Sequence, residues 1–225
     1  MKKILIFIDW YTPAFKAGGP ISSIYNLTQF LEEEINFYIV TSNKDLNSKK
    51  GLQGIKTNEW QQINKSKVIY LDKGFQTKRM LKKIVNDINP DKIYLNGLFS
   101  FFFSILPCYL FKKKIEIIIN PRGMFGSNAL SKKKFKKLLF IKLANTISFY
   151  KNICWHISNE AELFELKNNI KVVSKHYIIP NLPKVLKHNN NKRIDNKELR
   201  LISICRINEI KNIHFVLEIL KDINI

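Results

Sequence analysis

The chain has 225 residues, of which 45% are hydrophobic and 25% charged, so its composition is that of a globular protein and excludes a disordered one. Its formal net charge of +20 attracts polyanions such as nucleic acid, anionic lipid head groups and phosphorylated substrates. The three cysteines are far apart and form no CxxC pair, which argues against structural zinc and favours a reducing compartment.

Strand and helix patterns alternate along the first 183 residues. The near-continuous apolar run at 4–8 is typical of a strand buried on both faces of a parallel sheet, and Pro20 suits the first turn of the next helix. Further strands are expected at 37–40, 68–71, 93–95, 116–119, 155–157 and 177–179, and helices at 20–34, 80–88, 101–111, 132–143 and 159–166. Residues 42–67 are polar and predict a loop or excursion. This alternation, without a hairpin signal, predicts a doubly wound, Rossmann-like α/β sheet.

A second domain is expected to begin near the end of the chain. The first domain would span 1–183, and the asparagine-rich stretch 184–197 predicts an interdomain linker. A strand at 199–204 and a helix around Val216, Leu217 and Leu220 then open a domain at 198–225. One strand and one helix cannot form a core, so we expect this domain to be incomplete.

The first candidate site is Gly18-Gly19-Pro20, between the first strand and the first helix. Glycines permit close backbone approach, and a helix N-terminus offers unpaired N–H groups to an anion. The pattern is neither the dinucleotide fingerprint G-x-G-x-x-G nor a P-loop. Taken alone, it also fits a tight turn without a ligand.

Two other strands also end in polar turns, Asn96-Gly97 and Asn120-Pro121-Arg122-Gly123. Ligands of open α/β sheets bind beyond the carboxyl ends of the strands. The planar fork of Arg122 suits phosphate or carboxylate, whereas Asn96 can form hydrogen bonds but cannot titrate near neutrality. The alternatives are a turn-forming Asn-Gly pair and an arginine in a salt bridge.

Basic residues gather directly after the second of these turns: Lys132, Lys133, Lys134, Lys136 and Lys137. They share a helix with an apolar stripe of Phe135, Leu138, Leu139 and Leu143. Such a helix can lie on an anionic lipid surface, and a solvated helix face is the alternative. The most apolar segment, 98–111, is too short to cross a bilayer and contains Pro107, so no transmembrane helix is expected.

Several motifs together resemble the group 1 (family four) nucleotide-sugar glycosyltransferases of GT-B architecture. They are Gly18-Gly19-Pro20, Asn120-Pro121-Arg122-Gly123-Met124-Phe125 with Ala129-Leu130 and the lysines, and Arg206 with Lys211. The resemblance implies transfer of a sugar from a nucleotide-sugar donor to a saccharide or lipid-linked acceptor, with retention and without a metal or other cofactor. It also implies a cytoplasmic protein, peripheral at the inner face of the membrane, that serves cell-envelope polysaccharide biosynthesis.

The resemblance also assigns residues to two sides of a cleft. Arg206 and Lys211 would hold the donor diphosphate together with Gly18 and Gly19. Asn96, Arg122 and Gly123 would line the acceptor side, while no catalytic residue is assigned.

The sequence departs from the family pattern at three positions. Asn96 stands where relatives often carry histidine, and Cys205 and Asn212 stand where glycines are usual. The family's glutamate pair of the second domain would lie beyond Ile225. The 225 residues alone are therefore expected to show weak or no transferase activity.

Three other classes of protein account for parts of the sequence. The charge suggests nucleic-acid binding, but no recognised motif or basic stripe with interleaved aromatics is present, so no nucleic-acid partner is expected. The alternation suggests a dinucleotide-dependent oxidoreductase, which the missing G-x-G-x-x-G argues against. The lysine-rich helix suggests a noncatalytic membrane-surface module. The lack of a D-x-D pair after any strand disfavours a metal-dependent transferase of the other major architecture.

Overall fold

The computed structural model describes residues 1–131, 134–184, 201–205 and 211–222. The chain divides into two compact units, Met1–Leu186 and Lys187–Ile225. Each unit is described by itself.

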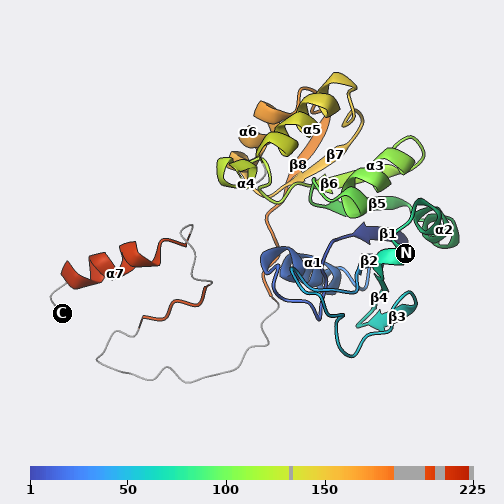
Figure 1. Cartoon of the computed structure of the whole chain (residues 1–225), viewed down its shortest axis with the longest axis horizontal. Coiled ribbons are helices and arrows are strands. Elements are labelled where there is room, and N and C mark those ends of the chain that lie inside the picture. Colours follow the sequence, from blue (N-terminus) through green and yellow to red (C-terminus); the bar gives the residue numbers. More distant parts are fainter. Residues whose placement is uncertain (132–133, 185–200, 206–210, 223–225) are drawn as a thin grey trace. The chain divides into compact units, whose positions relative to one another are not determined.

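The first unit is built on one eight-stranded sheet. Its strands are β1 (Lys2–Phe7), β2 (Ile35–Ser42), β3 (Trp60–Ile63), β4 (Ser66–Leu71), β5 (Lys92–Asn96), β6 (Glu116–Asn120), β7 (Cys154–Ile157) and β8 (Lys175–Ile178). They lie in the order β3-β4-β2-β1-β5-β6-β7-β8, which can be followed in Figure 1. Every neighbouring pair is parallel except β3 with β4. The order reverses between β1 and β5, so the ends of these two strands form the switch point where open α/β sheets bind ligands.

The hairpin of β3 and β4 was not predicted. The sequence predicts a loop or excursion at 42–67, without a strand, yet Trp60–Ile63 pairs antiparallel with the start of β4. The turn between the strands places Asn64 in the left-handed region, at φ 52°, without the usual glycine after it. The Trp60 ring also packs edge-on against Tyr38, with 5.8 Å between centroids. Because this contact joins distant segments, the local pattern did not reveal the strand.

Helices connect the strands: α1 (Gly19–Phe30), α2 (Lys78–Ile88), α3 (Leu106–Phe111), α4 (Ser127–Ser131), α5 (Lys134–Thr146) and α6 (Glu160–Asn169). Short turns of 3-10 helix at Lys73–Phe75 (η1) and of π-helix at Phe101–Ile105 (η2) precede α2 and α3. The predicted helix at 101–111 therefore begins as a π-helical turn.

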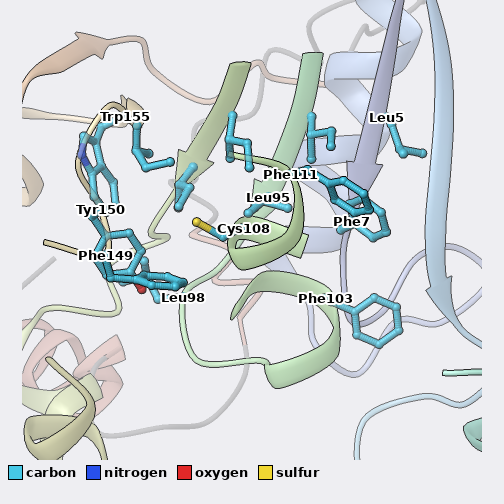
Figure 2. Close-up of a cluster of buried hydrophobic side chains, with 14 of the residues drawn as sticks. Leu5, Phe7, Leu95, Leu98, Phe103, Cys108, Phe111, Phe149, Tyr150 and Trp155 are labelled. Carbon is cyan, nitrogen blue, oxygen red and sulfur yellow. The ribbon is translucent and has the colours of Figure 1, made fainter. Parts of the chain in front are cut away.

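The two faces of the sheet are covered unequally. Leu5 and Phe7 of β1 point to one face, where α2, α3, α5 and α6 share a single apolar cluster, part of which is shown in Figure 2. Ile6 and Ile8 point to the other face and pack with Ile24 of α1. Among the described helices of this unit, α1 alone joins the cluster on that second face. The predicted doubly wound α/β sheet is confirmed.

The second unit contains α7 (Ile213–Asp222), which confirms the predicted helix around Leu217. The strand predicted at 199–204 is wrong for its described residues, since 201–204 carry no strand. A strand requires a hydrogen-bonded neighbour, and the described part of this unit provides none.

Candidate functional site

A polar cleft of about 660 Å³ lies where the loops after β6 and β7 meet the first turns of α1. Its lining includes Gly19 and Ser23 of α1, Arg122 and Gly123 after β6, and Glu162 of α6. These loops lie at the carboxyl ends of parallel strands, the edge of the sheet where ligands are expected. The cleft therefore brings together residues from two predicted motifs, Gly19 from the first loop and Arg122 with Gly123 from the turn after β6.

The guanidinium of Arg122 is held by neutral oxygen atoms. Its Nε donates to Oδ1 of Asn96 at 2.6 Å, and its Nη1 donates to Oγ of Ser23 at 2.8 Å and to Oδ1 of Asn181. Within the described residues, no carboxylate forms an ion pair with Arg122. Burial lowers the pKa of Arg122, although arginine keeps its charge at any physiological pH. The cleft therefore contains a fixed positive charge that no carboxylate of the described residues contacts directly, although the buried carboxylate of Glu162 interacts with it through space.

The backbone around Arg122 is an unusual turn held by buried acceptors. Arg122 and Gly123 both lie in the left-handed region, at φ 56° and φ 66°. The Arg122 N–H donates to Oδ1 of Asn120 at 3.0 Å, and the Gly123 N–H donates to Oε1 of Glu162 at 2.6 Å. The other oxygen of Glu162 accepts from the Ser158 N–H at 2.7 Å. One buried carboxylate thus joins the loops after β6 and β7 and sets the position of Arg122.

Of the two glycines in the Gly18-Gly19-Pro20 turn, only Gly19 lines the cleft. Gly18 is the N-cap of α1 with φ 67°, and no side chain caps the helix. A Cβ added at Gly19 would meet nothing within 4 Å, so the backbone there is open to an approaching group. Gly18 itself lines a neighbouring hollow with Thr12 and Lys184. Oδ2 of Asp45 accepts the N–H groups of Phe15 and Lys16 and fixes the preceding loop.

The other predicted site residues fall into three groups. Asn96 is buried, bonded to Arg122, and supports the cleft without lining it. Lys211 belongs to the second unit and Arg206 lies outside the described residues, so their role at the donor diphosphate stays a prediction. Lys132 and Lys133 also lie outside the described residues.

The helix predicted to meet a membrane, α5, turns apolar side chains to solvent. Phe135 is 79% exposed and Leu143 56%, and Leu138 and Leu139 are also exposed. Its core contacts come from Phe140, Ile141 and Ala144 instead. Lys134 and Lys136 are exposed, whereas Lys137 is half-buried and lies 5.1 Å from the centre of the Phe99 ring. We call Phe135, Leu138, Leu139 and Leu143, with Lys134 and Lys136, the α5 surface.

Sequence reasoning missed Ser23, Asn181 and Glu162. Ser23 and Asn181 bond to each other, at 2.7 Å between Oγ and Oδ1, and to Arg122 from segments far apart in sequence. Glu162 had a local signal, since Asn159 and Glu162 have the N-cap and N3 spacing of a capping pair. Asn159 indeed accepts from the Glu162 N–H at 2.9 Å, but the carboxylate binds the neighbouring loops.

A second polar pair, the buried Tyr94 and the half-buried His156, interacts electrostatically with Arg122. The Tyr94 hydroxyl is 2.8 Å from Nδ1 of His156, and Nε2 of His156 is 2.9 Å from the Ile179 carbonyl oxygen. Because a carbonyl only accepts, Nε2 carries the proton and Nδ1 accepts from Tyr94. Burial lowers the pKa of His156, with a smaller contribution from the positive charge of Arg122. The imidazole is therefore a neutral structural acceptor in this arrangement.

Two negative observations concern only the described part of the chain. No group of three or more His, Cys, Asp or Glu side chains there could hold a metal ion. None of the helices described has both the length and the apolar character to span a bilayer.

Comparison with known proteins supports the fold. No family model and no curated protein matches the sequence. Among solved structures, sucrose-phosphate synthase from Thermosynechococcus elongatus matches 80% of this chain with a TM-score of 0.54 and 13% sequence identity. The chain covers 48% of that protein, about half its length. At this identity the likeness shows the fold alone, a Rossmann-like α/β sheet.

Proposed function

We propose that this chain takes part in glycosyl transfer, from a nucleotide-sugar donor to a hydroxyl group of a saccharide or lipid-linked acceptor. The observation that carries the proposal is the polar cleft, in which Arg122 and the first turn of α1 meet at the carboxyl edge of the sheet. The fold shared with sucrose-phosphate synthase supports the same class of reaction. Cell-envelope polysaccharide biosynthesis, at the cytoplasmic face of a membrane, belongs to this proposal.

The chemistry requires stabilisation of the charge that builds up on the diphosphate leaving group. Fixed cations and helix N-termini in a closed cleft supply it without a metal ion or further cofactor. In the proposal Arg206 and Lys211 act on the donor diphosphate with Gly18 and Gly19. Asn96, Arg122 and Gly123 then serve the acceptor side. The proposed reaction retains the configuration of the anomeric carbon.

Donor binding is tested by calorimetric titration of the full chain with a panel of nucleotide sugars. The double variant Arg206→Ala, Lys211→Ala should weaken the binding constant at least about tenfold, because each charge-assisted hydrogen bond contributes about 1.5–3 kcal/mol. The control replaces Lys82 and Lys83, two exposed lysines of α2, and should leave binding unchanged. Equal affinity for all three proteins would contradict the donor assignment.

Transfer is tested by adding the chain and each donor to a membrane extract that contains lipid-linked saccharides. Because the 225 residues alone are expected to show weak activity at most, mass spectrometry should detect no more than a small amount of acceptor whose mass has increased by one sugar residue, and Arg122→Gln should reduce that amount. The lack of such a product with every donor, combined with the lack of nucleotide-sugar binding, would refute glycosyl transfer.

Binding to an anionic membrane surface is a second candidate, favoured by the exposed α5 surface. Apolar side chains next to lysines can insert at the head-group boundary while the charges attract anionic lipid. The full chain should sediment with phosphatidylglycerol vesicles at physiological salt, and Leu138→Ser with Leu139→Ser should abolish this. The control Phe164→Ser changes an apolar residue of α6 that is still more exposed, at 68%. Failure of the unaltered chain to bind would remove the idea.

A further inference from the structure

The structure contains a second hollow, which we call the apolar groove, on the face of the sheet that α1 shares. Its volume is about 420 Å³, within the range of about 300–1,000 Å³ typical of small-molecule sites. Its apolar lining includes Leu27, Phe30 and Leu31 of α1, Ile118 of β6, and Tyr177 and Ile179 at β8.

The groove exists because one face of the sheet is only partly covered. The helices α2, α3, α5 and α6 join the cluster on the opposite face, and α1 packs on residues of β1 and β2. On the α1 side of β8, Tyr177 remains 53% exposed and Ile179 49% exposed. Phe30, across the groove on α1, is 60% exposed. A contiguous apolar surface rimmed by polar groups is typical of a binding site.

The apolar groove and the polar cleft meet at Arg122. Both hollows are lined by Ser23, Arg122, Asn181 and Leu182. Nη2 of Arg122 takes part in none of the hydrogen bonds formed by the described residues, and the bonds of Nε and Nη1 go to neutral oxygens. One end of the groove therefore offers an anion a guanidinium N–H donor that has no hydrogen bond among the described residues.

The opposite end of the groove differs in charge. There the carboxylate of Glu116 lies between Lys92, at 2.6 Å, and Lys175, at 3.4 Å. Lys92 and Lys175 already share a carboxylate in direct contact, whereas none of the described carboxylates forms an ion pair with Arg122. An anionic head group would consequently be placed at the Arg122 end.

We propose that the apolar groove and Arg122 together bind an amphiphile, with its hydrocarbon chain in the groove and a phosphate head group at Nη2. This rests on the proposed function and deepens it: the chain would be the lipid part of a lipid-linked acceptor, whose saccharide reaches the polar cleft. A second copy of this protein is a poor occupant because the net charge of +20 opposes self-association.

The probes are octyl, decyl and dodecyl phosphate, titrated calorimetrically into the full chain below their micelle concentrations. Affinity should rise about tenfold for each added pair of methylenes until the groove is full. Inorganic phosphate and decanol, which each lack one half of the amphiphile, should bind much more weakly than decyl phosphate. Affinity that does not depend on chain length, or equal binding of inorganic phosphate, would overturn the proposal.

Variants locate the binding. Phe30→Ser with Tyr177→Ser, both at exposed positions, should weaken decyl phosphate binding at least about tenfold without unfolding the protein. The matched control, Phe164→Ser with Tyr109→Ser, changes a phenylalanine of α6 and a tyrosine of α3 that are also exposed and lie outside the groove, and it should have no effect. Arg122→Gln should reduce the affinity for decyl phosphate to that for decanol. Equal losses in the groove and control variants would refute the groove as the site.

Two outcomes separate this proposal from glycosyl transfer. Decyl phosphate binding without any nucleotide-sugar binding would sustain the groove and refute the transferase. Sugar transfer without amphiphile binding would support the transferase and refute the groove as an amphiphile site. If the groove variants change the sedimentation mass of the protein but not amphiphile binding, a second copy occupies the groove and the proposal is wrong.

Discussion

At the scale of single residues, the site depends on the conformation of Arg122. A strand-end arginine before glycine was visible in the sequence, and so was its chemical suitability for anions. Its left-handed backbone and its bonds to Ser23 and Asn181 were not visible, because those partners come from α1 and from the segment after β8. An arginine fork is positioned by whichever oxygens the fold brings near it.

The left-handed turn predicts an unusual order of stabilities at Arg122. Arg122→Gly should be more stable than Arg122→Ala by about 1 kcal/mol, because only glycine adopts a positive φ without a steric cost. Urea unfolding monitored by circular dichroism measures the difference. At exposed Lys136, inside helix α5, the order should be reversed, with alanine more stable. The same order at both positions would show that the turn is not left-handed.

The environment of His156 predicts a specific pH dependence. Burial lowers its pKa in the folded protein below the usual 6.5, so the unfolded chain takes up this proton first. Stability should therefore fall as the pH decreases from about 6.5 to the lower folded pKa, and His156→Gln should flatten that part of the curve. A nuclear magnetic resonance titration of the histidine ring protons gives the folded pKa directly. A titration midpoint of His156 at or above pH 6.5 would contradict the lowered pKa of this imidazole.

For helices and strands, the spacing of apolar residues predicted most elements. It failed for β3 and for the buried face of α5, because contacts between distant segments determine both. β3 is a short, half-exposed strand that exists because it pairs with β4 and packs on Tyr38. In α5 the stripe of Phe135, Leu138 and Leu143 was recognised, but the core lies under Phe140, Ile141 and Ala144 instead. Apolar residues lie on more than one face of α5, and the elements that pack against the helix determine which face is buried.

The orientation of α5 can be tested by two neighbouring substitutions. Ile141→Ala should lower the free energy of unfolding by about 2–5 kcal/mol, because it leaves a cavity in the core. Leu139→Ala, which shortens an exposed side chain, should change it by no more than about 0.5 kcal/mol. Urea denaturation of the two variants measures both values. Equal losses would mean that the helix is rotated and the α5 surface is buried.

At the scale of the whole molecule, the described apolar clusters belong to the first unit. Their buried members run from Leu5 to Ile170, and further partly buried residues pack against them. The second unit contributes α7, whose apolar residues Phe215, Val216 and Leu217 are exposed. Stability of the chain should therefore come from residues before Leu186.

Removal of residues 187–225 tests this division. The shortened chain should unfold at the same urea midpoint and with nearly the same denaturant dependence as the full chain, since little buried surface is lost. Retention of decyl phosphate binding would serve as a control for the integrity of the groove. A clear drop in the midpoint would show that the second unit stabilises the first.

The sequence by itself determined the class of fold and the chemical character of the site. Alternating apolar segments of the right length specify parallel strands with crossover helices, and this topology places the residues that follow the strands, among them Arg122, at the carboxyl edge of the sheet. Which of these residues meet depends on the tertiary structure. Gly19, Arg122 and Gly123 line one cleft, and Glu162 fixes the turn that contains Arg122 and Gly123. Arg122 also borders the apolar groove. The reason is physical. Periodicity records what each segment can bury, whereas a site depends on contacts between segments that are adjacent only after folding.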